Sequence, residues 1–365
     1  MHSHSLQKRK SRSPAFQILL EMMPTPVHKS MEQHAARKSR DAGGLVELRR
    51  SSCQSCWSFT NIPVLVERPT VSSGVGVFAL FDLEPGKCLI EEIPLAAWDI
   101  DASNAQTDVS ELDRIVASLT PKMRQTFQGL WDVHDTSGHK SAFGIWMSNA
   151  YQREFGDAFA PAEDVISHGA VFAIICRINH SCRPNSHVAW NHGTLRQTVH
   201  ALRPIQAGEE ITVCYLGAGA LSPRATRKAV LLRTKGFDCA CAACCLRGEA
   251  LEQSEERMRR LDELRTLLTD GREGASLVGV VDELWRLAEA DGAPCAWLRA
   301  EAIAAMVHAQ KAGADAQACA QAHLRWAQRG ASSCALALGA GAPTTTKFEM
   351  VAKRALARVR AVQKS

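Results

Sequence analysis

Four cysteines in two separate segments constrain this 365-residue chain more than any other feature. One lies in the segment 179–185, Asn-His-Ser-Cys-Arg-Pro-Asn, and three follow later in a C-x-C-x-x-C spacing. These cysteines are Cys182, Cys239, Cys241 and Cys244. Four thiolates satisfy a closed tetrahedral zinc site. We therefore predict a structural zinc ion that ties the two segments together, with Cys245, the neighbour of Cys244, as an alternative fourth ligand.

Five short motifs follow one another along the chain. They are Gly-Val-Gly-Val-Phe-Ala at 74–79, Ser-Asn-Ala-Tyr at 148–151, Asn-His-Ser-Cys-Arg-Pro-Asn at 179–185, Gly-Glu-Glu-Ile-Thr-Val-Cys-Tyr at 208–215 and Phe-Asp-Cys-Ala-Cys-Ala-Ala-Cys at 237–244. In this order they resemble the motifs of SET-domain protein lysine methyltransferases, in particular the SMYD-like branch and its fungal relatives. A lone Gly-x-Gly is weakly specific. Five motifs in sequence, over roughly half of the chain, are far more specific.

The resemblance implies a function and a set of site residues. It implies an enzyme that transfers a methyl group from S-adenosyl-L-methionine to the lysine ε-amine of a protein, histone or non-histone, with Tyr215 as the catalytic residue. It places the cofactor against Gly74, Val75, Gly76, Asn149, Asn179, His180, Tyr215 and Phe237. His180 is expected to contact the cofactor and support the fold rather than act as a general base. Without the motifs, Tyr215 would indicate only the end of a buried strand, and Phe237 only a core residue.

The expected fold class is α+β. We predict a β-rich SET-fold catalytic domain with helical insertions, a post-SET zinc site and an all-α C-terminal domain. The predicted segments are a basic, disordered N-terminal segment at 1–60, the SET domain at 61–218 with its insertion at about 99–177, the post-SET segment at 219–248 and the helical domain at 249–365. Many relatives insert a cysteine-rich MYND zinc finger, but residues 99–140 contain no cysteine, so we expect that finger to be absent.

Hydrophobic periodicity predicts the elements within these segments. Alternating apolar residues at 62–98 indicate a β-meander, and further strands are expected at 194–202 and 210–215. Helical spacing predicts helices at 108–131 with a break at Pro121, at 141–155, at 163–177, and in the C-terminal domain at 251–269, 277–291, 295–311, 315–329 and 346–361.

The distribution of charge bears on the partners and the cellular location of the protein. The formal charge is +5, and residues 1–60 hold ten lysines and arginines against four acids, so the rest of the chain is near neutral. The basic segment leaves open a mitochondrial transit peptide, a nuclear-import signal or a nucleic-acid contact. Otherwise we expect neither nucleic-acid nor membrane binding. Cys53 and Cys56 lack partners at metal spacing, and we assign them no function.

Thirteen cysteines, several in apolar runs, indicate a reducing compartment, so we expect a nuclear or cytoplasmic location. Two alternatives to an enzyme stay open. One is a catalytically inactive SET-fold module that binds proteins. The other is a zinc-dependent nucleic-acid-binding protein that uses the basic N-terminal segment.

Overall fold

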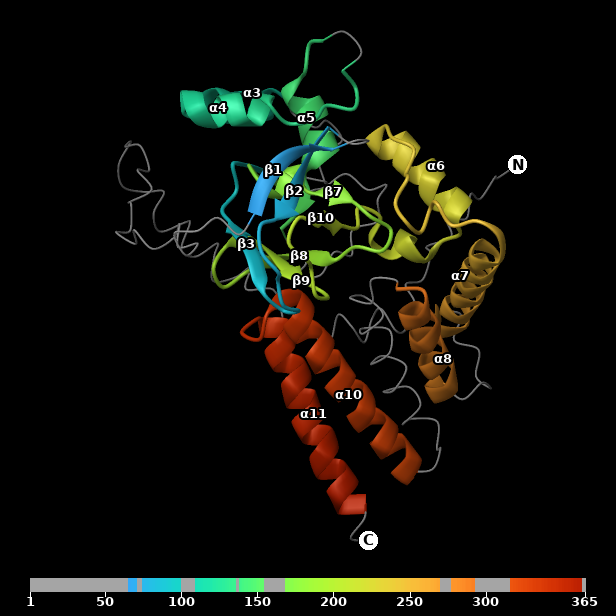
Figure 1. Ribbon diagram of the computed structural model, residues 1–365. Coiled ribbons are helices and arrows are strands. Elements are labelled where there is room, and N and C mark those ends of the chain that lie inside the picture. The colour runs from blue at the N-terminus through green and yellow to red at the C-terminus, as the bar shows by residue number, and fades with distance from the viewer. Residues whose placement is uncertain are drawn as a thin grey trace, which may run out of the picture.

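The computed structural model describes residues 65–70, 74–99, 109–135, 138–153, 168–269, 277–292 and 316–362. Within these ranges the strands form small sheets at the centre of the molecule, and helices surround them (Figure 1). This mixture confirms the predicted α+β class. The predictions for residues 1–60 and for a helix at 295–311 lie outside the described residues. Among the described helices, none combines the length and the apolar composition needed to span a bilayer.

Three sheets make up the central part of the described structure. The first has the order β1-β2-β10-β7, formed by β1 (Leu65–Thr70), β2 (Gly74–Ala79), β10 (Glu210–Val213) and β7 (Asn179–His180). The second has the order β3-β9-β8, formed by β3 (Cys88–Glu92), β9 (Arg196–Ala201) and β8 (Ser186–Asn191). The third has the order β4-β6-β5, formed by β4 (Ala96–Asp99), β6 (His168–Val171) and β5 (Tyr151–Gln152).

The predicted β-meander at 62–98 is wrong in its pairing, although its strands exist. Only β1 and β2 are neighbours, while β3 pairs with β9 and β4 pairs with β6. Alternation of apolar residues shows which segments are extended but does not identify their partners. The partners are set by a shared core between the sheets, in which Val77, Leu89 and Val199 are buried. Burial of these apolar side chains favours the long-range pairing.

Three helices cover one end of the sheets: α3 (Val109–Ser118), α4 (Pro121–Gln128) and α5 (Ala142–Asn149). The predicted break at Pro121 is confirmed, because Thr120 caps α4 by accepting a hydrogen bond from the Met123 N–H at 3.3 Å. The helix predicted at 141–155 ends earlier, at Asn149, and the chain continues as β5.

The helix predicted at 163–177 is wrong over the part that the structure describes. Residues 168–171 form β6, and a short 3-10 helix, η1 (Ile175–Arg177), follows. The carboxylate of Glu92 accepts hydrogen bonds from the N–H groups of residues 173, 174 and 175, at 2.8 to 3.2 Å. A tertiary contact from β3 therefore replaces the helical hydrogen bonds that the apolar run alone would suggest.

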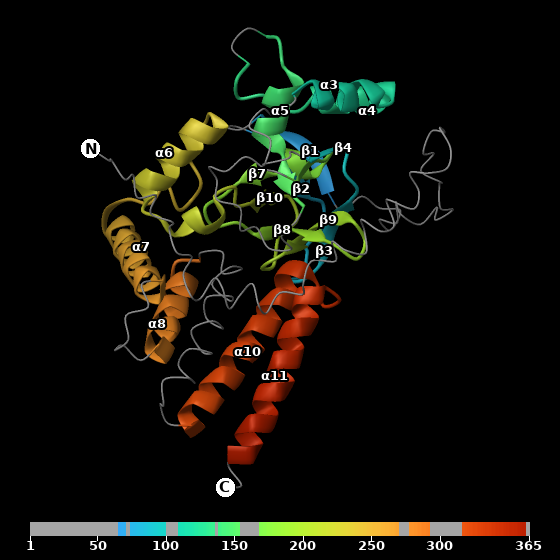
Figure 2. The same cartoon turned by 180° about the vertical axis from the view of Figure 1, so that it is seen from behind.

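The C-terminal part is helical, as predicted. After η2 (Gly217–Leu221) it contains α6 (Arg224–Lys235), α7 (Gly248–Thr269), α8 (Leu277–Ala290), α10 (Ala316–Leu338) and α11 (Pro343–Val362). Figures 1 and 2 show α6, α7 and α8 on one side of the sheets, while the α10–α11 hairpin extends away from β8 and β9. The helix predicted at 315–329 continues through Gly330 to Leu338. Glycine is required at position 330 because a Cβ there would lie 2.6 Å from the Phe348 ring of α11.

Candidate functional site

Three of the sequence motifs lie in one sheet. β2 carries Gly74, Val75 and Gly76, β7 carries Asn179 and His180, and β10 carries residues 210–213 of the Gly-Glu-Glu motif. The Asn179 side-chain amide donates to the Val75 carbonyl at 3.3 Å and to the Glu210 carboxylate at 2.7 Å. Asn179 therefore joins the segments that sequence analysis assigned to the cofactor.

Asn185, the last residue of the 179–185 signature, is hydrogen-bonded to the beginning of β10. The Asn185 side-chain amide donates to the Glu209 carboxylate at 3.0 Å and to the Glu210 carbonyl at 2.8 Å. Its oxygen accepts from the Thr212 N–H at 2.8 Å. With its side chain 1% exposed and fully hydrogen-bonded, Asn185 fixes the loop rather than offering a ligand contact.

Tyr215 is the second residue after β10 and is held by two hydrogen bonds. Its main-chain N–H donates to Nδ1 of His180 at 3.0 Å, and its hydroxyl donates to the carbonyl of Ile178 at 2.5 Å. Burial, followed by the nearby Cys176 thiol, raises the pKa of Tyr215 above its usual value, so the phenol keeps its proton. The hydroxyl hydrogen is used within the chain, which leaves the oxygen lone pairs free to accept.

The hydrogen bonds of His180 define its tautomer. Nδ1 accepts from Tyr215, so the ring hydrogen is on Nε2, which lies 3.3 Å from the Cys182 sulfur. Burial lowers the pKa of His180 to about 4, and the imidazole is neutral near pH 7. With one nitrogen bonded to Tyr215 and the other against a cysteine sulfur, His180 connects the two and is not placed as a general base.

Partly exposed rings gather beside this sheet. The His180 ring lies 5.2 Å from the Tyr215 ring and 6.1 Å from the Phe237 ring, measured between centroids. All three side chains are half-buried, and Val75 is 40% exposed. Flat ring faces next to the exposed Val75 fit a heteroaromatic ligand.

Asn149 is also brought toward this region, but its side chain serves the chain itself. Its amide donates to the carbonyls of Trp131 and Ile145, both at 2.6 Å, so both amide hydrogens are used. The main-chain carbonyl of Asn149 accepts from the Cys176 thiol at 3.4 Å. Cys176 in turn lies close to Tyr215. Only the amide oxygen of Asn149 is left for a ligand.

The four predicted cysteines come together. The sulfur atoms of Cys182, Cys239, Cys241 and Cys244 all lie within 4.8 Å of one another. The Cys182 and Cys244 sulfurs are 3.6 Å apart, close to the edge of about 3.8 Å expected for a tetrahedron with zinc–sulfur bonds of about 2.3 Å. Three of these side chains are buried, and the donor set is one that zinc prefers. The geometry therefore fits a structural zinc ion.

The alternative ligand Cys245 lies outside this group. It is exposed, and its sulfur donates to the Ala240 carbonyl at 3.2 Å. The main-chain N–H groups of Cys244 and Cys245 both donate to the Cys241 carbonyl, which forms the tight turn. This turn directs Cys244 into the cluster and Cys245 out of it.

Sequence reasoning missed Arg227, a buried arginine of α6 beside the cysteines. Its guanidinium donates to the Ser222 carbonyl at 2.6 Å. Burial opposes its charge, but the Cys182 and Cys244 thiols nearby raise the pKa of Arg227 above its usual value. Four thiolates around one Zn²⁺ carry a net charge of −2, so a buried cation beside them is favourable. The spacing of Arg227 from the cysteines gave no sequence signal for this contact.

The comparisons with known proteins agree with this arrangement. A family model described as "SET domain" matches residues 74–216, the stretch that holds the shared sheet, the signature and Tyr215. Residues 74–216 form a SET domain. The SET fold of the predicted α+β class is thereby confirmed.

Several curated proteins are similar to this chain. The chain is 28% identical over 198 residues to "Histone-lysine N-methyltransferase set5" of Schizosaccharomyces pombe, covering 54% of this chain and 53% of that protein. It is 32% identical over 174 residues to "Histone-lysine N-methyltransferase SMYD3" of Mus musculus, covering 44% and 39%. It is 39% identical over 74 residues to "Protein-lysine N-methyltransferase SMYD4" of Mus musculus, covering 20% and 9%. The chain thus spans about half, or less, of these relatives.

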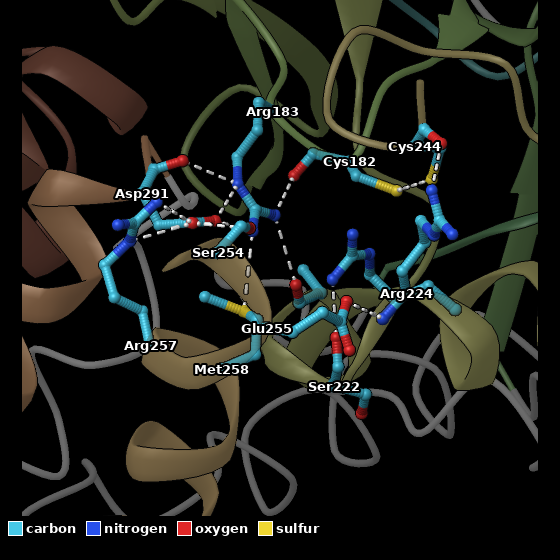
Figure 3. A network of polar contacts seen from close by, with 12 residues as sticks. Cys182, Arg183, Ser222, Arg224, Cys244, Ser254, Glu255, Arg257, Met258 and Asp291 are labelled. Carbon is cyan, nitrogen blue, oxygen red and sulfur yellow. Dashed lines mark hydrogen bonds and ion pairs between the residues drawn. The ribbon is translucent and has the colours of Figure 1, made fainter. Parts of the chain in front are cut away.

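A polar network joins the SET domain to the C-terminal helices. Figure 3 shows Arg183, the residue after Cys182, pointing toward Asp291 at the end of α8. Arg183 also donates to the carbonyls of Cys182 and Ala220, at 2.7 and 3.3 Å. The sequence assigned no role to Arg183, so this connection was not foreseen.

Proposed function

We propose that this protein transfers a methyl group from S-adenosyl-L-methionine to the lysine ε-amine of a protein substrate. The position of Tyr215 carries the proposal: its N–H is fixed by His180 and its hydroxyl by Ile178, where the SET motifs meet. Relatives named as histone-lysine and protein-lysine methyltransferases support the same reaction class.

The chain offers residues to hold the donor, which supplies a methyl group activated by its sulfonium. Val75 is 40% exposed and lies between two glycines that carry no side chain, so this end of β2 would allow close approach of the amino-acid or ribose part. The rings of His180 and Phe237 would pack against the adenine. Asn179 would add polar contacts through its amide oxygen, since its nitrogen already binds Val75 and Glu210.

Methyl transfer also requires a neutral acceptor amine. An unperturbed lysine has a pKa of about 10.4 and is almost wholly protonated near pH 7. Burial beside the half-buried rings would disfavour the ammonium. Tyr215 assists because it keeps its proton: a phenolate would stabilise the ammonium far more strongly than a neutral phenol does. Its oxygen can accept weak hydrogen bonds from the amine or from the polarised methyl group.

The zinc ion would have a structural role here. With four cysteine ligands its coordination is closed, so it offers no position for substrate or water. Its effect would pass through Cys182, whose sulfur contacts the His180 ring that in turn fixes Tyr215. Zinc would thus hold the signature in the geometry that aligns donor and acceptor, an alignment worth several kcal/mol, on the order of 7 or more in favourable systems.

The test is methyl incorporation by the full chain from isotope-labelled S-adenosyl-L-methionine into recombinant histone octamers and an array of lysine peptides. We expect label in at least one acceptor and none with Tyr215→Phe. The array separates histone from non-histone preference. If the full chain binds the donor by calorimetry but labels no acceptor, the catalytically inactive binding module becomes the better account.

A further inference from the structure

A lysine of this chain lies beside the catalytic candidate. Lys235 is the last residue of α6, and Gly236 ends the helix in the left-handed conformation, with φ of 75°. A Cβ at Gly236 would lie 2.4 Å from Val133, so the turn needs glycine. The turn leads directly to Phe237, so Lys235 lies two residues before one of the three partly exposed rings described above.

The contacts of the Lys235 amine are unusual for a lysine. Nζ lies 5.8 Å from the centroid of the Tyr215 ring and donates to the carbonyl of Ser148 at 3.0 Å. Among the described residues it has no carboxylate partner. Lys228, on the same helix, instead pairs with Asp238 at 2.9 Å.

This environment favours the neutral form of the amine. Burial lowers the pKa of Lys235, although the nearby Cys176 thiol acts in the opposite direction. The titratable groups that face it are Cys176 and Tyr215, and burial holds both in their uncharged forms because it raises the pKa of each. An ammonium withdrawn from water without a carboxylate is costly, whereas a neutral amine needs only one good hydrogen bond.

A simpler role for Lys235 is to cap α5, because Ser148 lies in the last turn of that helix and its carbonyl needs a donor. Capping explains the hydrogen bond to Ser148. It does not explain why the amine lies over the Tyr215 ring, since a capping lysine works equally well with its ammonium in water.

We propose that Lys235 is itself a methyl acceptor of the active site, modified within its own chain. This inference rests on the proposed methyltransferase function. The Lys235 nitrogen lone pair would form the new N–C bond, and the C–S bond electrons would remain on sulfur, so that S-adenosyl-L-homocysteine leaves. The methylated nitrogen then carries a positive charge and its original two hydrogens, and it either releases one of them to solvent as a proton or stays a methylammonium. The first methylation still leaves a hydrogen for the Ser148 carbonyl.

The experiment uses the full chain, deuterated-methyl S-adenosyl-L-methionine and an array peptide or histone octamer in the same tube, with peptide mapping by mass spectrometry. We expect label on Lys235 in wild type. The labelled fraction should grow at a rate independent of protein concentration, because the active site and the acceptor lysine belong to one chain. Lys235→Arg is the control for site assignment. Label on the added substrate with none on Lys235 overturns the inference and leaves the proposed function intact. Label on neither overturns the proposed function.

A second readout needs no donor. The titration of lysine side-chain signals by nuclear magnetic resonance, with the Lys235 signal assigned by its loss in Lys235→Arg, should show a lower proton affinity for Lys235 than for Lys228. Equal proton affinities for the two lysines would overturn the inference.

In the labelling experiment, a labelling rate that rises in proportion to protein concentration would overturn modification within one chain.

Discussion

Arg183 and Asp291 are joined by hydrogen bonds although 108 residues separate them. The Arg183 Nε donates to the Asp291 carboxylate at 2.7 Å and to its main-chain carbonyl at 2.8 Å. From the opposite side, Arg257 and Ser254 of α7 donate to the other carboxylate oxygen (Figure 3). The Asp291 side chain is only 3% exposed, so this carboxylate is a buried centre between the signature and the helices.

Removing the carboxylate should therefore destabilise the protein. In Asp291→Ala, Arg183 and Arg257 lose their shared partner, and an uncompensated buried charge remains. We expect the free energy of unfolding to fall by about 3 kcal/mol, measured by urea denaturation. The matched control is Asp113→Ala on the exposed face of α3, with an expected change within about 0.5 kcal/mol. Equal midpoints for the two variants would show that Asp291 is not a stabilising centre.

The zinc prediction is tested by two cysteines of the same segment, one inside the four-sulfur cluster and one outside it. Cys239→Ser removes one of the four clustered thiols, whereas Cys245→Ser changes an exposed thiol outside the cluster. We expect Cys239→Ser to lose its zinc, measured by plasma mass spectrometry, and its melting temperature to drop by about 10 °C or more. Cys245→Ser should keep one zinc per chain. A wild-type preparation that contains no zinc and is fully folded would contradict the prediction.

Arg227 should tune the affinity for zinc without binding it. Because its cation lies beside the Cys182 and Cys244 thiols, Arg227→Met would leave the negative charge of the zinc–thiolate group less compensated. Zinc should be removed by a competing chelator about tenfold to a hundredfold more readily, the range found for groups that support metal ligands. The control is Arg233→Met on the exposed side of α6. Zinc affinities that match between the two variants would leave Arg227 a purely structural residue.

Much of this site could be predicted from short-range patterns, and the remainder depends on long-range packing. The spacing of Cys239, Cys241 and Cys244 already implies one turn that faces a common point, so the cluster is visible in the sequence. Strand periodicity likewise located β2 and β10. The pairing of β3 with β9 is different, because it depends on a core that forms only when distant segments meet.

The residues that sequence reasoning missed share this dependence. Arg227 and Lys235 lie on a helix whose sequence resembles an ordinary basic surface, and only the fold places one beside the cysteines and the other over Tyr215. Asn149 shows the converse. Its motif predicted a cofactor contact, but the structure uses both of its amide hydrogens on main-chain carbonyls that the sequence does not reveal as partners.

The catalytic assignment is best tested with the two tyrosines of the chain, Tyr215 and Tyr151. Tyr215→Phe removes the hydroxyl that donates to Ile178 and whose oxygen would face the acceptor. We expect the turnover number to fall about a hundredfold or more, as when one group that stabilises a transition state is lost. Donor affinity, measured by calorimetry, should change by less than about threefold, because the ring and its packing on His180 remain.

Tyr151 provides the matched control because its ring packs on Phe172, 6.3 Å between centroids, against the same core that supports Tyr215. Tyr151→Phe keeps this ring contact and should retain turnover within about threefold of wild type, because burial is the main influence on the Tyr151 phenol and its hydroxyl is assigned no role in the reaction. If both variants lose turnover equally, the effect comes from disturbed packing and not from the Tyr215 oxygen. If neither does, methyl transfer does not depend on the phenol, and alignment by His180 and the signature must suffice.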